Sequence, residues 1–324
     1  MSFIISGYGR ICDTSVALYD DQLNMLWNDS IESPGFVCDG GNYFFATTET
    51  KTHAALHAYR KSGIGYTMTD KISVEGGLLC HISFSEKTSL LFGACYWTGN
   101  IFCVPFNNGE FGKIRYIWQK RDAELTRVHC VLLNHETEDG DLELLTTNMA
   151  LDMLNIYRVQ DGHMCQKQAI QLKRGIGPRH IIFSKDHTRL YLITEYSNEV
   201  IVFDTKDYTI LQVISTLPTD FSGESNCSTL CFSEDGRFLY GANRFHDTIT
   251  VFSVQENGLL TYQGEFACRG KNPRHMVIAG DILAICYLDS DAVSFVKLDP
   301  ESGMEKEESG RIFFGTPSGI IYKK

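Results

Sequence analysis

The sequence predicts an all-β protein: a seven-bladed β-propeller with four antiparallel strands in each blade. Three observations lead to this prediction. The chain carries an internal repeat of 43 to 51 residues, its apolar runs are short and rich in Val, Ile, Phe, Tyr and Thr, and helical periodicity is almost absent. Four short strands fit within one such repeat, and repeats of this length are typical of propeller blades.

The repeat is clearest in two segments, GPRHIIF at residues 177–183 and NPRHMVI at residues 272–278, each followed by a polar turn and a second apolar run. The residues at the position of His180 in successive copies are spaced by 45, 48, 51, 49, 46 and 43 residues. These residues are Phe36, His81, His129, His180, Thr229, His275 and Ser318. Because the copies follow one another without a linker, residues 1–324 are expected to form a single domain.

Each copy is expected to hold an inner strand at this position, then a turn and further strands. Second strands are expected at residues 42–47, 89–95, 142–147, 189–194, 237–242 and 282–286, and third strands are clearest at 199–203 and 248–252. The chain begins with second-strand and third-strand runs at 3–6 and 16–19, and it ends with a first-strand run at 319–322. We therefore expect the two ends to share one blade, which closes the ring and removes an exposed sheet edge.

Composition narrows the possible partners and the location. The 29 Lys and Arg against 40 Asp and Glu give a net charge of −11, which argues against nucleic acid, because its binders depend on clustered basic residues. The N-terminal MSFIISG lacks a basic signal-peptide region, and no run reaches the roughly 18 apolar residues of a membrane helix. The 11 cysteines are odd in number and include no C-x-x-C pair, so we expect reduced thiols in a cytoplasmic protein without membrane contact. The sequence predicts no oligomeric state.

The predicted fold brings polar residues together at one end of the ring. Consecutive strands are antiparallel, so the start of each inner strand and the end of each second strand lie at the same mouth of the central channel. These positions differ from blade to blade while the apolar positions repeat, which favours a site there. Four arginines and four histidines are expected at this mouth: Arg127, Arg179, Arg244, Arg274, His81, His129, His180 and His275. Guanidinium groups bind carboxylates and phosphates, so the predicted partner is a small anionic substrate.

Some of these residues have a structural interpretation as well. His180 and His275 follow Pro-Arg at the same position of two blades, and a residue that the fold repeats is more often a hydrogen-bonding partner than a catalyst. Arg179 and Arg274 recur in the same way, and the competing interpretation for them is hydrogen bonding to carbonyl groups of neighbouring blades. Both interpretations stay open for these four residues.

A functional interpretation is favoured for Glu195 and Arg244, because each is expected to occur once at its position in the repeat. A metal site is not predicted. His53 and His57 have i,i+4 spacing, but they lie in a strand or turn context without a third ligand. No cofactor is predicted either.

Longer motifs extend over nearly the whole chain. They are GIGPRH at 175–180 with Phe183, YLITE at 191–195, SEDGRFLY at 233–240 through Asn243-Arg244, NPRH at 272–275, and Cys80-His81 followed by Tyr96 and Gly99. With these motifs the sequence resembles the lactonase family of seven-bladed propellers, which includes propeller-type 6-phosphogluconolactonase and the carboxy-muconate lactonizing enzyme.

The resemblance implies an active site made of His129, Arg179, Glu195 and Arg244. The chain departs from the family around the first of these, with Arg127-Val128-His129 where the family usually has His-x-His. It also has NMA at residues 148–150 where Asp-Leu-Gly is usual, and it has Cys95 in place of an Asn. The two departures around His129 lie beside the expected substrate. The expected substrate-binding residues at the mouth are His81, Arg127, His180, Arg274 and His275.

These residues suggest a hydrolase that opens a sugar lactone, above all 6-phosphogluconolactone to 6-phosphogluconate. His129 or Glu195 would take a proton from the attacking water, and Arg179 and Arg244 would stabilise the oxyanion. Arg127 or Arg274 would hold a phosphate or carboxylate of the substrate. Two alternatives stay open: a carboxy-muconate-type lactonizing cycloisomerase, and a non-catalytic propeller that binds a metabolite or a protein at the mouth.

Overall fold

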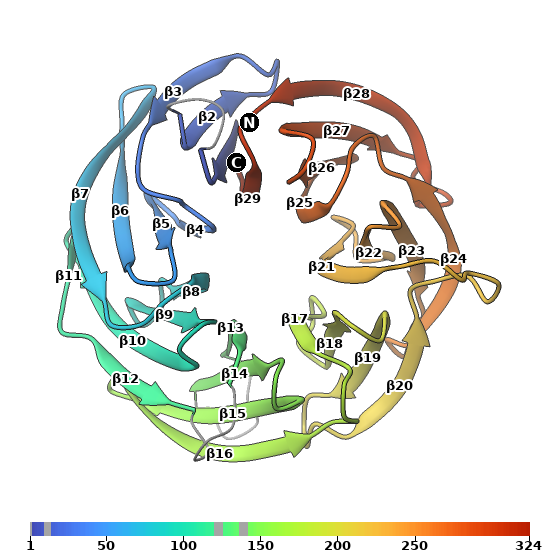
Figure 1. Cartoon of the computed structure of the whole chain (residues 1–324), viewed down its shortest axis with the longest axis horizontal. Helices are drawn as coiled ribbons and strands as arrows, with labels where there is room; N and C mark the ends of the chain where they lie inside the picture. Colours follow the sequence, from blue (N-terminus) through green and yellow to red (C-terminus); the bar gives the residue numbers. More distant parts are fainter. Residues whose placement is uncertain (1, 10–13, 120–125, 136–141) are drawn as a thin grey trace.

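The computed structural model describes residues 2–9, 14–119, 126–135 and 142–324. Its strands form seven sheets around a central channel, and Figure 1 looks down the axis of the ring. The described residues form strands and turns without a helix, which confirms the predicted seven-bladed β-propeller. We number the blades 1 to 7 from the one that contains the N-terminus.

In each of the first four blades the strands follow one another outward from the channel. Blade 1 is β29 (Pro317–Lys323), β1 (Ser2–Gly7), β2 (Val16–Asp20) and β3 (Met25–Asp29). Blade 2 is β4 (Val37–Gly40), β5 (Tyr43–Glu49), β6 (Ala54–Ser62) and β7 (Gly65–Val74). Blade 3 is β8 (Leu79–Ser85), β9 (Leu90–Cys95), β10 (Asn100–Asn107) and β12 (Arg115–Trp118), and β11 (Glu110–Phe111) also pairs with β10. Blade 4 is β13 (Val128–Asn134), β14 (Leu142–Asn148), β15 (Met153–Gln160) and β16 (His163–Gln171).

The last three blades repeat the same order. Blade 5 is β17 (Pro178–Phe183), β18 (Arg189–Thr194), β19 (Glu199–Asp204) and β20 (Ile210–Ser215). Blade 6 is β21 (Asn226–Phe232), β22 (Phe238–Arg244), β23 (Thr248–Val254) and β24 (Leu260–Ala267). Blade 7 is β25 (Pro273–Ala279), β26 (Ile282–Tyr287), β27 (Ala292–Leu298) and β28 (Glu305–Phe313).

The two ends of the chain complete blade 1 together, as the sequence predicts. Strand β29 pairs antiparallel with β1, and Phe3 lies opposite Tyr322. Figure 1 shows both termini in this blade, with β29 next to the channel. Blade 1 therefore has four strands like the other blades, because the last strand of the chain supplies the inner strand that the first residues lack.

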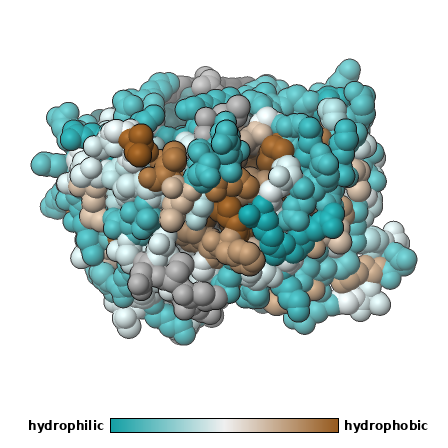
Figure 2. All heavy atoms as spheres, turned by 90° about the horizontal axis from the view of Figure 1, so that it is seen from above, coloured by the Kyte–Doolittle hydropathy of each residue, from teal (hydrophilic) through white to brown (hydrophobic). Residues whose placement is uncertain are grey.

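The core lies between neighbouring blades, which explains why the inner strands are apolar on both faces. The rings of Phe44 and Tyr59 in blade 2 are stacked with centroids 4.6 Å apart, and Trp27 of blade 1 packs edge-on against Tyr59 at 5.6 Å. The fourth strands face solvent, and β16 is mostly exposed. Figure 2 shows one side of the ring, where hydrophilic residues surround a band of hydrophobic ones.

The described residues contain no helix that is long and apolar enough to cross a membrane. The cysteines in the described part of the chain are free thiols, as predicted, and most of them are buried. Cys165 is the exposed one.

The inner strands carry an extra residue near their start. In blade 5, Pro178 lies opposite Thr194 and His180 opposite Ile193, so Arg179 is the unpaired residue of a β-bulge. In blade 4, Val128 lies opposite Asn148 and Cys130 opposite Thr147, so the bulge residue there is His129. The alignments of His129 and Ser318 with His180 are therefore wrong by one residue each, because Ser318 is the bulge residue of blade 1. His129 corresponds to Arg179, and Cys130 corresponds to His180.

Candidate functional site

Three layers of residues line the mouth of the channel, one residue from each blade in every layer. The bulge layer is Ser318, Gly35, Cys80, His129, Arg179, Ser228 and Arg274 for blades 1 to 7. The histidine layer, one residue further along each inner strand, is Gly319, Phe36, His81, Cys130, His180, Thr229 and His275. The mouth layer, at the end of each second strand, is Tyr8, Glu49, Tyr96, Met149, Glu195, Arg244 and Leu288. The predicted meeting of inner-strand starts and second-strand ends is thus confirmed.

The histidine layer joins each blade to the next. In three blades a ring Nδ1 accepts a backbone N–H from the following blade, at the equivalent position each time. The pairs are His81 with Val131 at 3.5 Å, His180 with Leu230 at 3.1 Å, and His275 with Ile320 at 3.2 Å. The structural interpretation of these histidines therefore has a physical basis.

The same rings carry no charge at neutral pH. Burial, reinforced by neighbouring cationic groups, lowers the pKa of His81 to about 3 and of His275 to about 4, and it holds the pKa of His180 well below its usual value. These three histidines supply hydrogen-bonding groups but no positive charge for an anion. Their role in binding substrate stays a prediction.

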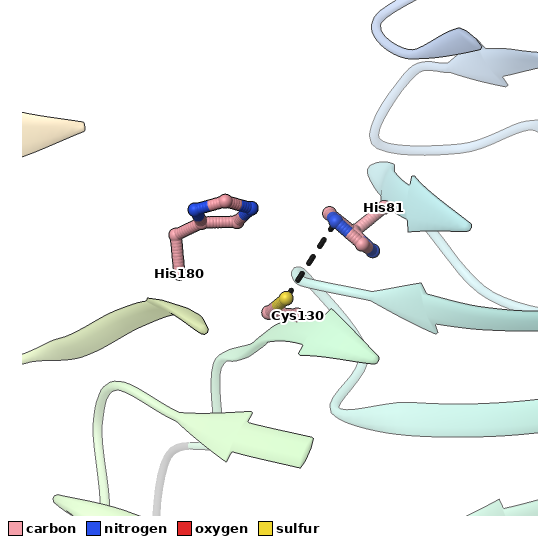
Figure 3. Close-up of side chains that lie close together, drawn as sticks. All are labelled: His81, Cys130 and His180. Carbon is pink, nitrogen blue, oxygen red and sulfur yellow. Dashed lines mark hydrogen bonds between the residues drawn. The ribbon is translucent and has the colours of Figure 1, made fainter. Parts of the chain in front are cut away.

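His81, Cys130 and His180 lie close together in the channel, and Figure 3 shows their side chains. Their potential ligand atoms lie within 4.8 Å of one another, and Nε2 of His81 is 3.5 Å from Sγ of Cys130. A metal ion would have to displace protons from this donor set. Because Nδ1 of His81 accepts a backbone N–H, the ring proton lies on Nε2, and burial raises the pKa of the Cys130 thiol to about 12. Metal ligation needs an unprotonated nitrogen and a thiolate.

An ion-paired cluster lies at the mouth between blades 5 and 6. Oε2 of Glu195 accepts from Nε of Arg179 at 2.8 Å and is 3.0 Å from Nη2 of Arg244. The side chains are 16%, 4% and 11% exposed, in that order. Arg179 also donates to the carbonyl of Ser228 in blade 6, so it ties two blades as well as holding the carboxylate. Arg244 donates to the carbonyl of Cys227 at 3.2 Å.

These contacts fix the charge states of the cluster. Burial alone raises the pKa of Glu195, but the guanidinium groups of Arg179 and Arg244 outweigh it and hold that pKa below its usual value. Burial, with repulsion from Arg274, lowers the pKa of Arg179 to about 9, which still leaves it protonated at pH 7. Glu195 is therefore ionised and engaged by two cations, and it is better suited to orient them than to take a proton.

His129 lies in the bulge layer, in the blade next to Arg179. Its residue is 8% exposed, its ring packs edge-on against Tyr96 at 5.9 Å, and its Nδ1 is buried without a hydrogen-bond partner among the described residues. Burial, then the charges of Arg179 and Arg274, lowers the pKa of His129 well below its usual value. The imidazole is therefore neutral and has an unused nitrogen.

A second carboxyl group lies on the other side of the mouth. The Tyr8 hydroxyl donates to Oε2 of Glu49 at 3.0 Å, and Arg274 lies near both groups. Burial lowers the pKa of Arg274, but the nearby Tyr8, Glu49 and Glu195 outweigh it and raise that pKa above its usual value. No role was assigned to Tyr8 or Glu49 from the sequence. Three guanidinium groups and an ionised Glu195 make this part of the mouth positive, although the protein as a whole is acidic.

Two hollows adjoin these groups. A cavity of about 20 Å³ at the bottom of the mouth is bounded by His129, Arg179, Arg274 and the three linking histidines, among others. A wider pocket of about 670 Å³ lies over blades 3 to 5. Its walls are Tyr96, Arg127, Met149, Ala150, Leu151, Asp152, Met153, Gln171, Arg174, Gly175 and Tyr196.

Arg127 lies in the wider pocket, away from the other predicted arginines. Its guanidinium carbon lies 4.5 Å from the ring centroid of Trp97 and 5.3 Å from that of Tyr96, and Nη1 donates to the Trp97 carbonyl at 3.2 Å. Sequence reasoning missed Arg174 and Tyr196, which line the same pocket from loops of blades 4 and 5. A possible signal for Tyr196 is Gly177, whose φ is +63° and where a Cβ would lie 2.5 Å from the tyrosine ring.

Comparisons with known proteins identify the family. The family profile described as "Lactonase, 7-bladed beta-propeller" matches residues 22–321. A 6-phosphogluconolactonase from Bacillus subtilis is 26% identical over 272 residues, which cover 76% of this chain and 77% of that protein. The structure of a periplasmic gluconolactonase from Pseudomonas aeruginosa superposes with a TM-score of 0.89 at 21% identity, over 99% of this chain and 98% of the other. The structure of a protein from Lactobacillus plantarum superposes with a TM-score of 0.88 at 18% identity, over 100% of this chain and 99% of the other.

The two structural likenesses, at these identities, show the fold alone. The profile match extends over most of the chain, from blade 1 to the strand that closes the ring. The chain therefore belongs to the lactonase family of seven-bladed β-propellers.

Proposed function

We propose that this protein is a lactone hydrolase whose substrate is an acidic sugar lactone, most specifically 6-phosphogluconolactone, which it converts to 6-phosphogluconate. The observation that carries the proposal is the ion-paired cluster of Arg179, Glu195 and Arg244 beside a neutral His129 with an unused ring nitrogen. The similarity to the Bacillus subtilis 6-phosphogluconolactonase supports the choice of substrate.

The proposed reaction begins with a water molecule next to His129. Its imidazole takes a proton as the water oxygen attacks the lactone carbonyl carbon. The carbonyl oxygen becomes an oxyanion, which Arg179 and Arg244 stabilise through N–H groups that Glu195 does not use. Glu195 holds both guanidinium groups in place before the substrate arrives, so little reorganisation is needed during the reaction.

The two hollows offer separate places for the attacking water and for the substrate. A cavity of about 20 Å³ holds roughly one water molecule, so the sugar has to lie above it, in the mouth. The pocket of about 670 Å³ is large enough for an extended arm of the substrate, and Arg127 and Arg174 offer positive charge there. We place the phosphate of the substrate in this pocket. The free thiols support a cytoplasmic location, although the Pseudomonas aeruginosa relative is described as periplasmic.

The test is hydrolysis of freshly generated 6-phosphogluconolactone, followed by coupled oxidation of the product. We expect wild type to exceed the spontaneous rate, and we expect His129→Gln and Glu195→Gln to lose at least about 100-fold in kcat. Arg127→Ala should instead raise KM for the phosphorylated lactone more than for gluconolactone. Asp204→Asn is the control, because that carboxylate pairs with Arg189 at 3.1 Å away from the mouth. Wild type no faster than the spontaneous reaction on either lactone would contradict the proposal.

A further inference from the structure

Glu49 and Glu195 occupy the same position in two different blades, so the expectation that Glu195 occurs only once at its position in the repeat is wrong. The backbone N–H of Glu49 donates to the carbonyl of Ser33 at 2.9 Å, and that of Glu195 donates to the carbonyl of Gly177 at 2.7 Å. Ser33 and Gly177 are each two residues before the bulge residue of their inner strand. Blades 2 and 5 are three blades apart in a ring of seven and lie on nearly opposite sides of the channel (Figure 1). The two glutamates therefore belong to nearly opposite sides of one mouth.

The two glutamates have different partners. Glu195 contacts two guanidinium groups, whereas Glu49 forms no ion pair within the described part of the chain. The partner of Glu49 is the Tyr8 hydroxyl, at 3.0 Å from Oε2. Glu49 is also more enclosed, with 9% of the residue exposed. One carboxyl group is thus held as an anion, and the other lies in a nearly water-free setting without a counter-ion in contact.

Gly35 makes room for the Glu49 carboxyl. A Cβ atom at position 35 would overlap Oε2 of Glu49. In blade 5 the equivalent bulge residue is Arg179, whose side chain fills this space itself. Because blade 2 has no side chain there, Glu49 reaches from the mouth layer to the level of the bulge layer, where Arg179 and Arg274 border the small cavity.

The surroundings favour a proton on Glu49 more than on Glu195. Burial raises the pKa of Glu49, and Arg274, Tyr8 and Arg179 offset it only in part. The titratable and charged groups around it come from several blades: Tyr8, Cys80, Cys95, Arg179 and Arg274. Two carboxyl groups with pKa values moved in opposite directions are the usual arrangement for an acid that works beside a carboxylate.

Lactone opening needs such an acid. After water adds to the carbonyl carbon, the bond between that carbon and the ring oxygen breaks, and the electron pair stays on the ring oxygen. That oxygen must gain a proton to become a hydroxyl group. His129 holds the proton taken from the water and lies on the attacking side of the substrate, so an acid on the opposite side of the mouth is suited to protonate the leaving oxygen.

We propose that Glu49 is this second catalytic group: its carboxyl donates a proton to the ring oxygen as the lactone opens, with Gly35 and Tyr8 holding it in place. The inference rests on the proposed hydrolysis. In the balanced step, lactone and water give a hydroxyl group, a carboxylate and one proton, which the new carboxyl group releases to solvent. The proton on His129 returns to Glu49 or to solvent, and no oxidant or metal takes part.

The experiment compares Glu49→Gln, Tyr8→Phe and Gly35→Ala with wild type on 6-phosphogluconolactone and gluconolactone across a range of pH. We expect Glu49→Gln to lower kcat about 100-fold with little change in KM, and to abolish the fall in rate at high pH that deprotonation of an acid causes. Gly35→Ala displaces the carboxyl group and should also lower kcat. Tyr8→Phe should shift the pH at which the rate falls on the alkaline side. Infrared spectroscopy should show a protonated-carboxyl band at neutral pH that Glu49→Gln lacks.

The matched control is Glu143→Gln. Glu143 is a buried glutamate that accepts from a tyrosine, Tyr208, at 2.6 Å, and it lies near the start of β14, at the far end of blade 4. A Glu49→Gln variant that folds like wild type and keeps the kcat and pH profile of Glu143→Gln would overturn the inference while leaving the hydrolase proposal intact. A wild-type protein that is inactive on both lactones would overturn the inference and the hydrolase proposal together. The inference would also be contradicted if Glu143→Gln lost the infrared band and Glu49→Gln kept it.

Discussion

The histidine layer and the bulge layer are one residue apart in each inner strand, yet their side chains are used differently. His81, His180 and His275 recur and make the same contact, an acceptor bond from the next blade. His129 and Arg179 in the bulge layer differ from blade to blade and face cavities and charged partners. The comparison teaches that, in a repeated fold, a side chain whose contact repeats stabilises the ring, whereas one whose contact is unique is a candidate for chemistry.

Among the variants that test this comparison, Arg179→Ala should have the largest effect on activity. Arg179→Ala takes away a donor for the oxyanion and one of the two cations that hold Glu195, so we expect kcat on 6-phosphogluconolactone to fall roughly 10²- to 10³-fold. Steady-state kinetics and circular dichroism measure the activity and the fold.

The control for Arg179→Ala is Arg189→Ala in the same blade. Arg189 forms an ion pair with Asp204 at 3.1 Å and lies at the other end of β18, so its loss should leave kcat unchanged. If Arg179→Ala unfolds the protein, or if both variants lose activity equally, the bulge layer would be structural like the histidine layer, and the comparison would fail.

Removing a histidine should affect stability and spare activity. His180→Ala leaves the backbone N–H of Leu230 without its acceptor, which costs about 1–3 kcal/mol of unfolding free energy. Urea denaturation measures this loss, and kcat should stay within a few-fold of wild type. His180→Gln is the rescue variant, because its side-chain oxygen is an acceptor too. A large fall in kcat in the well-folded His180→Gln would instead support the predicted role of His180 in binding substrate.

The fold could be predicted because its signals repeat. The Pro-Arg-His segments of blades 5 and 7 set the period, and the runs at residues 3–6 and 319–322 have the strand character that the shared blade requires. What could not be predicted was the exact register of blades 1 and 4. A β-bulge adds one residue without any mark in the sequence, so His129 was aligned with His180 instead of Arg179.

The site was predictable only in part. Arg179, Glu195 and Arg244 meet because they lie at strand ends that the repeat locates. The importance of Glu49 was missed, because it depends on a missing side chain at Gly35 in a blade without the Pro-Arg-His motif. Arg174 was missed for a different reason: it lies in a loop, where the repeat gives no position.

Acidification should produce the smallest effect, which is a loss of stability that comes from the buried neutral histidines. The pKa of His275 is about 4 in the folded protein and about 6.5 in an unfolded chain, so the unfolded state binds a proton first as the pH falls. The stability that this residue contributes is present above about pH 6.5 and is lost between that pH and about 4. Between pH 7 and pH 5.5 the loss amounts to about 1 kcal/mol. His275→Gln keeps an acceptor and does not titrate, so its urea midpoint should fall less than that of wild type over this interval. Parallel curves for the two proteins would mean that the pKa of His275 is the same in the folded and unfolded states, so that burial would not hold the ring neutral.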